Sequence, residues 1–110
     1  MPSRTDQSAT ERRLYSKLRQ LLATPGLLRG NLVEMRRVCG RATCGCARDP
    51  AARHRSLYLG LSLQGQRRMV YIPAAWEADV RRWVTRYAEV RAVLEQIALR
   101  YLGRVQRREG

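Results

Sequence analysis

The stretch LYLGLSLQGQRRMVYI, residues 57–72, predicts a β-hairpin on which the rest of the fold is built. Leucines occupy every second position from Leu57 to Leu63, which is the pattern of a strand with one buried face. Tyr58 alternates with them and points the other way. A tight turn follows at Gln64–Gln66, and the segment Arg67–Ile72 returns as the next strand.

A further strand and a short helix are predicted upstream of the hairpin. The segment Arg29–Cys39, RGNLVEMRRVC, is interpreted as a strand in which Val33 and Met35 share one face. Together with the hairpin it forms a three-stranded antiparallel meander. Leucines at helical spacing predict a helix over Glu11–Ala23, and the Pro25-Gly26 pair ends it.

A long amphipathic helix is predicted to begin after Pro73 and to end at Gly103. Its apolar residues recur at alternating steps of four and three, which is a heptad pattern. They are Trp76, Val80, Trp83, Tyr87, Val90, Leu94, Ile97 and Tyr101. The far part of this seam (Val90, Leu94, Ile97 and Tyr101) either packs within the chain or pairs with a second copy or a larger partner, and the pattern leaves both open.

These elements predict one α+β domain of a 110-residue chain. We expect a disordered N-terminus over 1–10, a zinc-stabilised domain over 11–103 and a basic tail over 104–110. The N-terminal residues MPSRTDQSATERR lack the apolar core of a secretion signal. No apolar run approaches the roughly 18 residues that a membrane span needs, so we expect a cytoplasmic protein with no membrane partner.

All three cysteines and the only histidine lie in residues 39–54, with the spacing Cys39-x4-Cys44-x-Cys46-x7-His54. Three thiolates and one imidazole complete a tetrahedral structural zinc site. The meander brings the end of its first strand near the start of its second, so Cys39 and His54 are expected to be neighbours. We therefore predict bound Zn²⁺ in a knuckle between these strands.

Two other interpretations of the cysteine segment stay open. A cysteine assisted by His54 is a nucleophile if nearby arginines lower the pKa of its thiol. The thiols are otherwise free and the histidine is incidental. Against an enzyme, no carboxylate is placed to orient His54, and zinc with four protein ligands keeps no position for substrate. We expect no enzymatic activity and no catalytic residue.

The segments GNLVEMRRVCGRATCGCA, LYLGLS and RRMVYIP, with His54 between the first two, resemble a family of bacterial and archaeal proteins of unknown function. The pattern of that family is similar to GSLVERYRKCGKPNCRCA…HGPYYYLSW…GG…R…VYVP, and the resemblance covers about Gly30 to Trp83. It implies a common Cys₃His site and a common fold, and it supplies no activity. The chain departs from the pattern after the histidine, where leucines at positions 57 and 59 replace tyrosines.

The chain carries a net charge of +13, and 21 of its 22 basic residues are arginine. The base composition of the gene explains much of the excess of arginine over lysine, but the net charge itself indicates a polyanionic partner. Residues 29–55 hold seven arginines and two carboxylates. The arginines predicted to contact nucleic acid are Arg36, Arg37, Arg41, Arg48, Arg53, Arg55, Arg67 and Arg68.

The sequence therefore favours a small zinc-binding, non-enzymatic protein that binds nucleic acid, DNA in preference to RNA, through arginines around the zinc knuckle. The alternative is a protein-interaction module. In that case the C-terminal helix forms a homodimer, or docks on a partner such as a recombinase, through its heptad seam.

Overall fold

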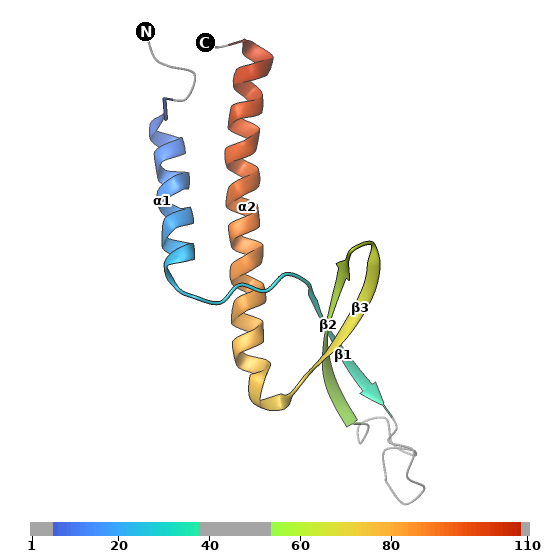
Figure 1. The fold of residues 1–110 in the computed structure, drawn as a ribbon. Helices are drawn as coiled ribbons and strands as arrows, with labels where there is room; N and C mark the ends of the chain where they lie inside the picture. The colour runs from blue at the N-terminus through green and yellow to red at the C-terminus, as the bar shows by residue number, and fades with distance from the viewer. Residues whose placement is uncertain (1–5, 38–53, 109–110) are drawn as a thin grey trace, which may run out of the picture. The chain divides into compact units, whose positions relative to one another are not determined.

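The computed structural model describes residues 6–37 and 54–108. The elements are α1 (Ala9–Ala23), β1 (Asn31–Arg37), β2 (His54–Leu63), β3 (Gln66–Ile72), a single 3₁₀ turn η3 (Ala74–Trp76) and α2 (Glu77–Arg107) (Figure 1). They divide into two compact units, Leu28–Val84 and the combination of Met1–Leu27 with Thr85–Gly110. We call these the sheet unit and the helical unit.

The three strands form an antiparallel sheet in the order β1-β2-β3, which confirms the predicted meander. Arg37 pairs with His54 at one end of the sheet, and Ser62 pairs with Arg67 at the other end. The α+β class, with a short N-terminal helix and a long C-terminal helix, is also confirmed.

The β2–β3 turn consists of Gln64 and Gly65, whose φ angles are 51° and 78°. Positive φ at both central residues is the geometry of a type I′ turn, whose twist matches that of the flanking strands. Glycine adopts this conformation without steric cost, so Gly65 fixes the position of the turn and the register of the hairpin.

The core of the sheet unit lies on the leucine side of the sheet. Leu57 and Leu59 are 2% and 4% exposed, and they pack with Ile72 and with Val80 of α2. Leu28, Leu32, Leu61, Trp83 and Val84 pack around this cluster. Burying one such leucine stabilises the fold by about 1.5–3 kcal/mol. The first turns of α2 therefore cover one face of the sheet.

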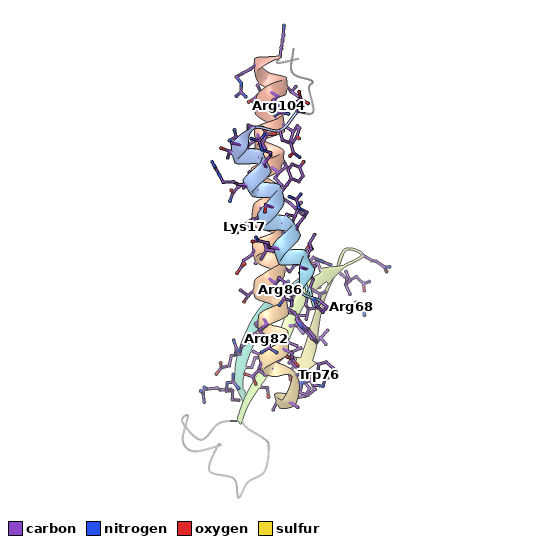
Figure 2. All side chains as sticks on the ribbon, turned by 90° about the vertical axis from the view of Figure 1, so that its left-hand side faces the viewer. Lys17, Arg68, Trp76, Arg82, Arg86 and Arg104 are labelled. Atoms are coloured by element: carbon purple, nitrogen blue, oxygen red, sulfur yellow. The ribbon has the colours of Figure 1, made fainter. Side chains whose placement is uncertain are left out.

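The helical unit pairs α1 with residues 85–107 of α2, and both figures show the two helices side by side (Figures 1 and 2). Val90, Val93 and Ile97 are its buried apolar residues among those described. At one end Arg104 hydrogen-bonds to Glu11, and at the other Arg86 Nη1 donates to the carbonyl oxygens of residues 25 and 26, at 2.8 and 2.6 Å.

Several element boundaries differ from those predicted. The first helix begins at Ala9, inside the stretch predicted to be disordered, because Ser8 is its N-cap. The Ser8 hydroxyl accepts a hydrogen bond from the Glu11 amide at 3.2 Å. The last helix continues through Gly103 to Arg107, so Arg104 lies in a helix and not in a tail. No helix among residues 6–37 and 54–108 is long and apolar enough to cross a membrane.

Candidate nucleic-acid interface

The face of the sheet opposite the leucine core carries two tyrosines, and we call it the tyrosine face. Strand alternation and register place ten described residues on it: Asn31, Val33, Met35, Ser56, Tyr58, Gly60, Ser62, Arg67, Met69 and Tyr71. None of these residues is acidic. Tyr71 is 56% exposed and Met69 is 43% exposed, so the β3 part of this face is open to solvent.

The two tyrosines of this face contact each other across the strands. Tyr58 and Tyr71 are directly opposite in the β2–β3 register. Their ring centroids are 5.8 Å apart and the ring planes meet at 67°. This edge-to-face contact holds both rings in defined positions on the sheet surface.

The Arg67 guanidinium lies close to Gly60 on the same face, where the absence of a side chain leaves room for it. A Cβ atom added at Gly60 would be 2.6 Å from Nη2 of Arg67 and 3.1 Å from the sulfur of Met69. The guanidinium therefore lies against β2 at Gly60. A guanidinium held this way presents both its charge and a planar surface.

The described carboxylates of the sheet unit, Glu34, Glu77 and Asp79, lie off this face and are paired. Glu34 is 3.0 Å from Nε of Arg55, whose guanidinium also hydrogen-bonds to Glu77. Asp79 pairs with Arg82. The bond from Arg55 lowers the pKa of the Glu77 carboxyl, and the two carboxylates raise the already high pKa of Arg55. The charge of Arg55 is thus compensated within the fold, where it ties β1 and β2 to the start of α2.

The predicted arginines that the structure describes lie toward both ends of the sheet. Arg37 pairs with His54 at one end of the sheet, whereas Arg67 and Arg68 begin β3 at the other end. Eight residues of β2 separate the ends, about 26 Å at 3.3 Å per residue. Figure 2 labels Arg68 on β3. Ion pairs among the described residues leave Arg67 and Arg68 without a carboxylate partner.

The predicted residues near the end of the sheet where Arg37 pairs with His54 are described only in part. Arg36 is exposed and lies 3.5 Å from Glu34. The predicted contacts Arg41, Arg48 and Arg53 lie outside the described residues, as do the predicted zinc ligands Cys39, Cys44 and Cys46. Within residues 6–37 and 54–108, no group of three or more potential ligands could hold a metal ion.

The predicted partner seam of α2 is largely engaged within the helical unit. Val90 and Ile97 are buried, each 7% exposed. Tyr101 hydrogen-bonds to Tyr15 of α1, which raises the pKa of Tyr15, and the Arg104 guanidinium lies 4.7 Å from the Tyr101 ring centroid. Of the four seam residues, Leu94 alone is about half exposed, at 49%.

Sequence reasoning missed two groups of residues. Met69 and Tyr71 follow Arg67 at alternate positions, and this spacing is the signal that places all three on one face of β3. On α2, Leu102 and Val105 are 49% and 72% exposed. Their spacing places them on one face of the helix together with Leu94, the exposed residue of the seam.

Fold and site together describe a small α+β protein with a basic, aromatic sheet face. The family model described as "Domain of unknown function (DUF6788)" matches residues 7–82, and the chain belongs to this family. The matched residues include α1, the whole sheet and the first turns of α2. No curated protein and no solved structure matches the chain. The predicted membership of an uncharacterised family is confirmed.

Proposed function

We propose that this chain is a small, cytoplasmic, zinc-stabilised protein that binds nucleic acid, DNA in preference to RNA, and has no enzymatic activity. The observation that carries the proposal is the separation of charge in the sheet unit. Its described carboxylates are paired with arginines, while the tyrosine face has no acidic residue and Arg67 and Arg68 have no carboxylate partner. A phosphate backbone is the partner that such a surface attracts.

Zinc is part of the same proposal, with Cys39, Cys44, Cys46 and His54 as its ligands. The donor set is complete for a structural site. The pairing of Arg37 with His54 supports it, because the backbone at position 37 is two residues before the first cysteine. An ion bound there would fix the segment that carries Arg41, Arg48 and Arg53. These three arginines would then add positive charge at this end of the sheet.

A salt-titrated binding assay tests the proposed function. The purified chain is mixed with a labelled 20-base-pair DNA duplex, with single-stranded DNA or with RNA of the same length, at increasing salt, with and without a zinc chelator. Neutralising five phosphates gives a log–log slope of about −4.5 on duplex DNA. We expect a steep slope and weaker binding after Arg67→Ala combined with Arg68→Ala. Absence of binding at low salt, or a slope near zero, overturns the proposal.

Assembly through α2 is the second candidate, and one observation favours it. Leu94, Leu102 and Val105 form an exposed apolar face in the helical unit, next to a core that contains only a few buried residues. Exposed apolar faces of this kind often mark contacts between proteins. A second copy of the chain would cover this face by placing its own α2 against it.

The oligomeric state tests this second candidate. We expect sedimentation equilibrium to give a dimer, and Leu94→Glu combined with Leu102→Glu to give a monomer with unchanged helix content. Gln96→Glu is the matched control, because it adds a carboxylate at an exposed position on another face of the same helix. A chain that remains monomeric at high concentration rules out the homodimer.

A further inference from the structure

We propose that the tyrosine face is a stacking platform for unpaired bases, so that the nucleic acid which this protein binds is single-stranded DNA. The inference rests on the proposed function and names its substrate class. The four central residues of the platform are Tyr58, Arg67, Met69 and Tyr71.

The geometry of β3 suits a strand of bases. Arg67, Met69 and Tyr71 occupy alternate positions of β3, so their side chains stand on one face and span about 13 Å at 3.3 Å per residue. Tyr58 lies beside Tyr71, with the ring centroids 5.8 Å apart. Sheets that bind single-stranded RNA stack two or three bases on aromatic side chains, and the same stacking is open to the bases of single-stranded DNA.

Flat side chains on a sheet do not suit duplex DNA. In a duplex the faces of the bases are covered by their neighbours, and proteins reach only the base edges from the grooves. Tyr71, which is 56% exposed, and the guanidinium of Arg67 over Gly60 offer planar surfaces to a base that has left its stack. Aromatic rings and guanidinium planes both stack on unpaired bases.

Charge complementarity selects nucleic acid over an apolar peptide as the occupant. The face contains Arg67 and no carboxylate, and Arg29 lies at the same end, where its Nη2 donates to the Ser62 carbonyl oxygen at 2.8 Å. Single strands bind where a positive groove follows the backbone and aromatic rings take the bases. Phosphates would therefore lie along the arginines while bases rest on the rings.

The decisive comparison uses four ligands of equal length: a 20-nucleotide oligo(dT), the same strand made abasic, a duplex, and oligo(U). The abasic strand keeps every phosphate and removes every base. We expect oligo(dT) to bind more tightly than the other three. Equal affinity for oligo(dT) and its abasic form overturns stacking, and tighter binding of oligo(U) overturns the choice of DNA.

Variants locate the effect on the face. Stacking is worth about 5- to 150-fold in affinity per base, so Tyr71→Ala should weaken binding to oligo(dT) by about that factor. Binding to the abasic strand should not change, and Tyr71→Phe should restore binding to oligo(dT). Val70→Ala is the matched control, since Val70 is the exposed neighbour on the other side of β3. If Tyr71→Ala and Val70→Ala behave alike, the platform is not at Tyr71.

The two proposals fail in different ways. If no nucleic acid binds at low salt, the proposed function fails and the platform fails with it. If duplex and abasic strands bind with a steep salt dependence while Tyr71→Ala changes nothing, the platform alone fails. A base analogue such as 2-aminopurine in the strand gives a second measurement, because its fluorescence decreases when it stacks. We expect that decrease with the native chain and its loss with Tyr71→Ala.

Discussion

Nη2 of Arg104 donates hydrogen bonds to both carboxylate oxygens of Glu11, at 2.6 and 2.8 Å, across 93 residues of sequence. The Glu11 side chain is 3% exposed and that of Arg104 is 15% exposed. Nε of Arg100 lies 3.7 Å from the same carboxylate. A buried carboxylate is tolerated only when cations and hydrogen bonds compensate its charge, so this pair fixes how α1 aligns on α2.

Removal of one partner should therefore destabilise the helical unit strongly. Arg104→Met removes both hydrogen bonds to the buried Glu11 carboxylate, and we expect a loss of about 3–5 kcal/mol in the free energy of unfolding. Urea denaturation followed by circular dichroism measures it. Arg82→Met is the control, because its pair with Asp79 is exposed and should contribute about 1 kcal/mol or less. Equal losses in the two variants would contradict a structural role for the buried pair.

The Glu77–Arg55 pair predicts a stability loss in acid. The hydrogen bond from Arg55 lowers the pKa of Glu77 in the folded chain below its ordinary value of 4.5. The unfolded chain then takes up the proton first, so the stabilisation is present above about pH 4.5 and is lost as the pH falls through the folded pKa.

Melting temperatures of the native chain and of Glu77→Gln, measured from neutral pH to about pH 3, test this effect. We expect the difference between the two proteins to shrink as the pH falls, because Glu77→Gln has no proton to take up at this position. A difference that stays constant over the whole range would show that Glu77 does not couple stability to pH.

Gly60→Ala should displace the Arg67 guanidinium and weaken DNA binding, while the sheet keeps most of its stability. The new Cβ would lie 2.6 Å from Arg67 Nη2, at the end of a flexible side chain that moves away at little cost. We expect a change in melting temperature of only a few degrees, and weaker binding of oligo(dT) with the same salt slope. Ser62→Ala, on the same face and strand, should leave binding unchanged. A large loss of stability would instead mean that the contact matters for folding.

Metal removal should affect the fold if the proposed zinc site is present. Structural sites contribute roughly 10–16 kcal/mol of apparent binding free energy in small zinc peptides. Cys44→Ala should therefore lower the melting temperature as chelation does, and the purified native chain should contain one equivalent of zinc. Rapid alkylation of a cysteine in the metal-loaded chain would instead favour a reactive thiol.

The sheet was predictable because its signals are local. Alternating leucines from Leu57 to Leu63 and a glycine in the turn specify strands, faces and register within sixteen residues. The same register places Arg67 far from Arg37. Counting charge along the sequence hides this separation, and the predicted single surface around the cysteines combined arginines from both ends of the sheet.

Other features depend on contacts between distant residues. The pairing of Arg55 with Glu77 spans 22 residues, and nothing near Arg55 in the sequence shows that its charge is compensated. The seam residues Val90 and Ile97 carry a heptad spacing that suits either an intramolecular or an intermolecular partner. Their burial within one chain could be decided only by the position of α1. Gly103 does not end α2, because one glycine costs only about 1 kcal/mol inside a long helix.

The place of β3 at the edge of the sheet also bears on solubility. One side of this strand has no neighbour among the described residues, and Met69, Val70 and Tyr71 are all about half exposed. An apolar edge strand is a template on which further strands can add, and flanking charges are a common protection against this. Arg67 and Arg68 occupy that flanking position. The two arginines proposed to attract DNA would thus also keep the chain from aggregating. Their replacement should therefore have two effects, weaker DNA binding and a greater tendency to form fibrils.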